Sequence, residues 1–128
     1  MISLSKRIFV IFRLVSLTLR YLSRAKKEVN KQTGKLDKSV RENYMRMWAK
    51  DFFDLLSIKV NAINTPLTTA PGLTVGTHVS YMDIPLLAHE YPATFLSKEE
   101  TSRWPVVGHT GKFMNTIYVK RDKSSSRS

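Results

Sequence analysis

A seven-residue repeat of basic side chains near the N-terminus constrains the fold of this chain more than any other feature. The repeat consists of Lys6, Arg13, Arg20 and Lys27. Residues spaced by seven share one face of an α-helix, and apolar residues then fall on the opposite face. These apolar residues are Ile8, Phe12, Val15, Leu19 and Leu22. The pattern therefore predicts an amphipathic helix across residues 8–22.

Three settings are open to this helix. An apolar face that contains Phe and Leu, set against a basic stripe, is typical of a helix that lies in the membrane interface. The alternative is a helix that docks on the protein's own core. A membrane span would have to be short and tilted, because Arg13 interrupts the apolar run and crossing a bilayer takes roughly 20 apolar residues. The interfacial setting is favoured.

The positive charge is concentrated in the same segment. Residues 1–35 contribute +8 to the net charge of +11, with Glu28 as the segment's one carboxylate. Such a segment suits anionic lipid or nucleic acid. The chain has no recognisable nucleic-acid-binding motif, and the aromatic residues of the segment lie mostly among apolar ones, so no nucleic-acid partner is predicted. A membrane surface is the partner that we expect.

The absence of cysteine excludes disulfides, thiolate zinc sites and cysteine nucleophiles. The three histidines are His78, His89 and His109. Their spacing matches no common metal-binding pattern, so no metal is predicted.

The remaining sequence alternates helical and strand patterns. After a polar break at residues 30–35, the S-x-x-E pattern of Ser39 and Glu42 predicts a helix that begins near Ser39 and ends at about Ile58. Short strands are predicted at residues 58–62, 73–76, 93–97 and 116–119. Helical stretches are predicted at residues 86–90 and after Trp104-Pro105. This alternation predicts an α/β domain.

His78 and Asp83 are the candidate reactive pair. Five residues turn a regular helix by about 500°, which would leave the two side chains about 140° apart. They can cooperate only if the chain turns between a strand end and a helix start, and Gly76 and Pro85 favour such a turn. Alternatively, Asp83 is a helix N-cap and His78 an ordinary loop residue. The spacing alone leaves both interpretations open.

The surrounding residues add a resemblance to a known family. Residues 77–83 (THVSYMD) resemble the N-H-x-S-x-x-D block of the glycerolipid acyltransferases, the family of 1-acyl-sn-glycerol-3-phosphate acyltransferase. Residues 95–99 and 104–108 are similar to the family's F-x-x-K-x-E … W-P-x-x-G segment. Residues 116–121 look like its second block, a short strand that ends in an arginine. The similarity runs from Arg41 to Lys123.

The resemblance implies transfer of a fatty acyl group from acyl-CoA or acyl carrier protein to a lysolipid hydroxyl, with no other cofactor. It implies that His78 is the general base and Asp83 its orienting partner. Arg121 would hold the acceptor's phosphate, for which a guanidinium fork is well suited. Lys120 would add charge there, and Ser80 would support the loop or the substrate. The resemblance also implies a location at the cytoplasmic face of a membrane.

The sequence departs from the family pattern in two places. Thr77 replaces the usual asparagine, and the family's E-G-T-R block, with the strands around it, does not occur in these 128 residues. We therefore expect a basic membrane-associating segment at 1–35, the first half of an acyltransferase α/β domain with an incomplete sheet at 36–123, and a disordered tail at 124–128. A truncated, non-catalytic membrane-binding remnant of the family is the alternative.

Overall fold

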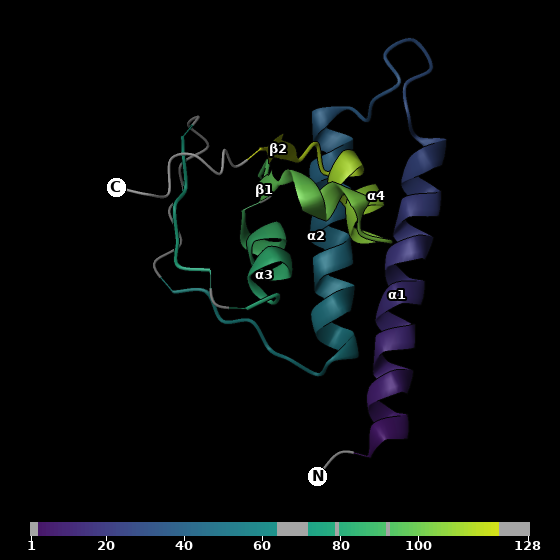
Figure 1. The fold of residues 1–128 in the computed structure, drawn as a ribbon, viewed down its shortest axis with the longest axis vertical. Helices are drawn as coiled ribbons and strands as arrows, with labels where there is room; N and C mark the ends of the chain where they lie inside the picture. Colours follow the sequence, from purple (N-terminus) through teal and green to yellow (C-terminus); the bar gives the residue numbers. More distant parts are fainter. Residues whose placement is uncertain (1–2, 64–71, 79, 92, 121–128) are drawn as a thin grey trace.

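The computed structural model describes residues 3–63, 72–78, 80–91 and 93–120. Within these ranges it contains four α-helices, one 3-10 helix and two short strands, which confirms the mixed helix and strand content. Two long helices, α1 (Leu4–Lys27) and α2 (Lys38–Leu55), run side by side and are joined at one end by the predicted polar break (Figure 1). The predicted tail and Arg121 lie outside the described residues.

Helix α1 extends beyond the predicted range at both ends and docks on α2 by a face other than the predicted apolar stripe. Its buried residues are Leu17, Thr18, Tyr21 and Ala25. Ile8 and Phe12 of the apolar stripe remain 59% and 67% exposed. The predicted amphipathic helix is therefore present, and it packs on the protein while its apolar stripe stays open. None of the helices in the described ranges combines the length and hydropathy that crossing a bilayer requires.

Helix α2 begins one residue before Ser39, with Asp37 at the N-cap position. The predicted capping pattern is wrong, because Ser39 lies inside the helix and its hydroxyl cannot occupy the cap. The helix ends at Leu55, where Ser57 adopts a positive φ of 56° that breaks the helical path. The strand predicted at 58–62 is also wrong, because these residues form no regular element.

Polar contacts join α1 to α2 inside their apolar interface. The Tyr21 hydroxyl donates to Asp51 Oδ2 at 2.6 Å, and the Trp48 indole N–H donates to Thr18 Oγ1 at 3.1 Å. Burial and the hydrogen bond to Asp51 raise the pKa of Tyr21 to about 12, because both favour the neutral phenol over the phenolate. These bonds fix the relative positions of the two helices.

The core lies between α2 and α3 (Asp83–Glu90), on the side of α2 away from α1 (Figure 1). Ala49 of α2 and Ala88 of α3 are both fully buried, so their small side chains let the two helix backbones approach closely. Met45 completes the buried cluster, and Trp48, Phe95 and Met114 pack around it. This packing holds α3, whose first residue is Asp83, against α2.

The strands β1 (Leu96–Lys98) and β2 (Ile117–Val119) form a parallel pair in which Leu96 faces Ile117. The connection between them contains the 3-10 helix η1 (Glu99–Arg103) and helix α4 (Val107–Phe113). The strand predicted at 116–119 is confirmed, and the one predicted at 93–97 is shifted toward the C-terminus. The strand predicted at 73–76 is wrong, because the described residues 72–78 pair with no neighbour.

Candidate active site

A tight turn at the start of α3 positions the candidate catalytic residues. The Asp83 N–H donates to the Ser80 carbonyl at 3.2 Å, and the Met82 N–H donates to Ser80 Oγ at 3.1 Å. Pro85, the third residue of α3, suits the first helical turn because the missing N–H has no helical partner there. The chain therefore turns between Ser80 and Asp83, just before α3, as Gly76 and Pro85 predicted.

The turn brings the two side chains into contact. His78 Nδ1 lies 2.9 Å from Asp83 Oδ2, and the Ser80 N–H donates to the same oxygen at 3.0 Å. The Asp83 side chain is 26% exposed, whereas that of His78 is 65% exposed. Asp83 is itself the first residue of α3, with Met82 at the N-cap position, so the alternative interpretation of Asp83 as the N-cap is wrong. The carboxylate is held by its neighbours, and the imidazole is open to solvent.

This geometry selects one tautomer of the neutral imidazole. An ionised carboxylate can only accept hydrogen bonds, so Nδ1 carries the proton that Asp83 Oδ2 accepts. Nε2 then presents a lone pair to solvent and can accept a proton from a bound hydroxyl. When it does, the positive charge that forms on the ring is stabilised by the carboxylate 2.9 Å away. The arrangement can therefore act as a general base.

The other predicted site residues lie in different positions. The Ser80 hydroxyl accepts the Met82 N–H and so supports the turn. Lys120 follows β2, and its ammonium lies 4.0 Å from Glu99 Oε1 with the side chain 80% exposed. The structure thus places Ser80 beside the His–Asp pair and Lys120 at the end of the strand pair. Arg121 lies outside the described residues.

A second histidine–carboxylate contact was not predicted from the sequence. His89 Nδ1 lies 2.6 Å from Glu90 Oε1, and the His89 ring packs edge-on against Phe53 at 6.2 Å. Its side chain is 33% exposed, about half as accessible as that of His78. Neighbours in sequence on a helix do not normally face each other, so the spacing gave no signal of this contact. In the described ranges, no group of three or more acidic or histidine side chains could hold a metal ion.

Comparison with known proteins gives consistent matches. The family model described as Acyltransferase matches residues 57–128, more than half of the chain. A lyso-ornithine lipid O-acyltransferase of Pseudomonas aeruginosa is 34% identical over 88 residues, which cover 69% of this chain and 34% of that protein. A 1-acyl-sn-glycerol-3-phosphate acyltransferase of Neisseria gonorrhoeae is 36% identical over 50 residues, which cover 39% of this chain and 20% of that protein. No solved structure gives a significant match. The chain thus spans at most about a third of the length of these relatives.

Proposed function

Because this chain belongs to the acyltransferase family, we propose that it takes part in transfer of a fatty acyl group to the hydroxyl of a lysolipid. The donor is an acyl thioester of coenzyme A or of acyl carrier protein. The acceptor is 1-acylglycerol-3-phosphate or a related lysolipid, a class that the names of both relatives support. The product would be a phospholipid precursor or another membrane lipid.

The proposed reaction is a direct displacement. His78 Nε2 removes the proton from the acceptor hydroxyl while that oxygen attacks the thioester carbonyl. The carbon–sulfur bond breaks, an ester forms, and the thiolate leaves with the proton that His78 returns. A positioned general base of this kind contributes about 10²–10⁴-fold. Asp83 holds the ring in the form that accepts the proton and offsets the charge that develops on it.

One observation carries the proposal: the 2.9 Å contact between His78 Nδ1 and Asp83 Oδ2, in which the His78 side chain stays 65% exposed. The exposure of the His78 side chain matters as much as the length of this contact, because the substrate must be able to reach the base. The half-buried pair of His89 and Glu90 has a similar contact but packs against Phe53. Accessibility therefore favours His78 over His89 as the base.

The direct test is an acyl-transfer assay with acyl-CoA and acyl carrier protein donors, each offered several lysolipid acceptors. We expect His78→Ala to abolish transfer. His109→Ala is the matched control, because His109 is an exposed histidine of α4. Equal activity of wild type and His78→Ala with any donor–acceptor pair would remove His78 from the mechanism.

Membrane binding without acyl transfer is the second candidate function. The open apolar stripe of α1 and the basic residues of the same helix support it, because both suit an anionic interface. Vesicle flotation separates the two functions. If the protein is an enzyme that reaches its lipid from the surface, His78→Ala loses transfer and keeps vesicle binding. If the wild-type chain binds vesicles and transfers no acyl group to any acceptor, membrane binding alone is favoured.

A further inference from the structure

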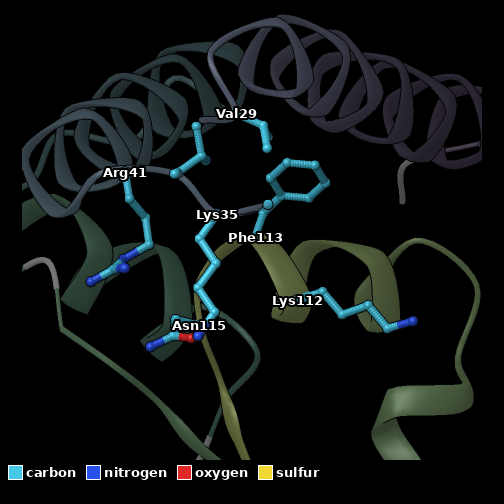
Figure 2. A pocket seen from close by; sticks show the side chains of 8 residues that line it. Val29, Lys35, Arg41, Lys112, Phe113 and Asn115 are labelled. Atoms are coloured by element: carbon cyan, nitrogen blue, oxygen red, sulfur yellow. The ribbon is translucent and has the colours of Figure 1, made fainter. Parts of the chain in front are cut away.

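A basic cavity lies at the opposite end of α2 from its C-terminal Leu55 and shares no lining residue with the His78–Asp83 pair. It is formed where the connection between α1 and α2 meets the end of α4 (Figure 2). Lys35 comes from the connection, Arg41 from the first turns of α2, and Lys112 and Asn115 from the end of α4. Its volume is about 190 Å³.

The charges of the cavity are not balanced. Its lining contains three cationic side chains and no carboxylate. The ion pairs that lysines make elsewhere in the described ranges use Lys38, Lys50 and Lys120, so Lys35, Arg41 and Lys112 have no carboxylate partner within the described part of the chain. Arg41 is also half-buried, which makes an unpaired charge less favourable than at the surface. An anion in the cavity would be attracted by these unpaired charges.

The side chains suit an anion with several acceptor oxygens. Figure 2 shows Lys35 extending toward Asn115, with Arg41 on one flank, whereas the side chain of Lys112 extends away from these three. A guanidinium fork binds phosphate oxygens in pairs, and the ammonium and amide groups add single donors. The ring of Phe113 lies near Val29 and gives the cavity an apolar part that a carbon chain next to the anion could contact.

Hydrogen bonds within the connection fix the backbone of the cavity rim. Asn30 Oδ1 accepts the N–H of Gln32 at 2.8 Å, and the Gly34 N–H donates to the Asn30 carbonyl at 2.8 Å. Gly34 has a φ of +66°, which glycine adopts without strain, and this turn directs the chain into Lys35. An ordered rim lowers the entropic cost of binding.

The volume limits the ligand. Pockets that enclose drug-sized molecules measure about 300–1,000 Å³, so a cavity of about 190 Å³ takes a group and not a whole nucleotide. We propose that this cavity binds a phosphate group, either the headgroup of an anionic phospholipid or a free phosphate. The site is separate from acyl transfer, so its test uses binding alone.

The test follows the backbone amide NMR signals of Gly34 and Asn115 during titration with inorganic phosphate. We expect saturable shifts in the wild type and binding weakened about tenfold or more in Lys35→Gln/Arg41→Gln, since each substitution removes a charged hydrogen-bond donor. Lys59→Gln is the matched control. It removes the same charge as Lys35→Gln alone, beyond the far end of α2, a helix whose 18 residues span about 27 Å.

Vesicle flotation distinguishes the two sources of phosphate. Phosphatidylcholine vesicles with and without phosphatidylglycerol are compared for the wild type, the double variant and Lys59→Gln. Loss of both phosphate binding and phosphatidylglycerol-dependent flotation in the double variant supports a lipid headgroup. Loss of phosphate binding alone supports a soluble ligand. Absence of saturable shifts in the wild type, or equal weakening by Lys59→Gln, would overturn the proposal.

Circular dichroism melting of each variant checks that the fold is retained. Arg41→Lys provides a second, milder change because it keeps the charge and removes the planar fork. We expect it to weaken phosphate binding less than Arg41→Gln does. If Arg41→Gln binds phosphate as well as the wild type in a fully folded protein, the cavity is not the site.

Discussion

At the scale of single residues, the oxygen Asp83 Oδ2 links the turn to the imidazole. It lies within hydrogen-bonding distance of both His78 Nδ1 and the Ser80 N–H. An asparagine at this position keeps the size of the side chain but can present its NH₂ group to the imidazole. Nδ1 would then accept, the proton would move to Nε2, and the base would be lost. The chemistry of His78 therefore depends on the charge of its neighbour.

We predict that Asp83→Asn lowers the rate of acyl transfer by about 10³–10⁴-fold with little change in stability. The tautomer with the proton on Nε2, which cannot act as the base, then predominates. The measurement is the transfer rate with saturating donor and acceptor. Glu90→Gln is the control, since it makes the same change beside His89. Comparable losses in both variants would indicate a structural effect on α3 and not a catalytic one.

How much of the site could be predicted also depends on individual residues. The turn between His78 and Asp83 was predictable because Gly76 and Pro85 favour it and the pair can cooperate only through it. The shared oxygen was not, because it depends on the backbone N–H of Ser80, which any residue except proline provides. The basic cavity gave no sequence signal, since Lys35 and Lys112 line the same cavity only through the packing of α4 near the connection.

At the scale of elements, helices followed from the sequence better than strands did. The spacing of apolar residues in α1 and α2 is a local property, and each helix forms its backbone hydrogen bonds within itself. A strand needs a partner. Leu73 and Val75 have a strand-like sequence, yet they are 90% and 83% exposed and pair with nothing in the described residues. Alternation therefore identified β2, which has a partner, and failed at 73–76.

The contact between α1 and α2 predicts a loss of stability at alkaline pH. The folded pKa of Tyr21, about 12, exceeds the value of 10.0 for an unperturbed tyrosine. The stability that this shift contributes is complete below pH 10, and it is lost as the pH rises toward 12, because the unfolded chain ionises first. We expect Tyr21→Phe to lower the free energy of unfolding at pH 7 by about 1–2 kcal/mol and to make the alkaline decline less steep.

Urea unfolding at several pH values measures this effect. Tyr44→Phe is the matched control, because Tyr44 packs edge-on against Tyr21 at 6.3 Å and no hydroxyl bond links it to Asp51 in the described part of the chain. An unchanged alkaline decline in Tyr21→Phe would show that another group is responsible.

The packing of α4 on η1 predicts a second effect at this scale. A Cβ on Gly108 would collide with the backbone carbonyl oxygen of Ser102, which cannot rotate away. Gly108→Ala should therefore lower the free energy of unfolding by about 1–3 kcal/mol through overpacking, less the roughly 1 kcal/mol that alanine gains in helix propensity. Gly72→Ala meets no atom within 4 Å and serves as the control in the same thermal or urea unfolding measurement. A Gly108→Ala protein at least as stable as the wild type would contradict this packing.

At the scale of the whole molecule, α2 packs against α1 on one side and against α3 on the other. It packs on α1 through Thr18 and Tyr21, and on α3 through Ala49 and Ala88. The face of α1 toward α2 is therefore needed for folding, and the opposite, apolar stripe is not. Leu17 is 6% exposed, whereas Phe12, five residues earlier on the same helix, is 67% exposed. One helix thus carries a buried face that packs on α2 and an apolar stripe that does not.

Substitutions on the two faces should have opposite consequences if the apolar stripe meets a membrane. Leu17→Ala should lower the free energy of unfolding by about 2–4 kcal/mol, with vesicle binding retained below its melting temperature. Phe12→Ser should leave stability within about 0.5 kcal/mol. It should weaken binding to phosphatidylglycerol vesicles about tenfold, because burying a phenylalanine in an apolar phase contributes about 1.5–3 kcal/mol. Paired urea unfolding and vesicle flotation measure both. If Phe12→Ser lowers stability as much as Leu17→Ala and leaves flotation unchanged, the stripe contacts protein and the membrane proposal fails.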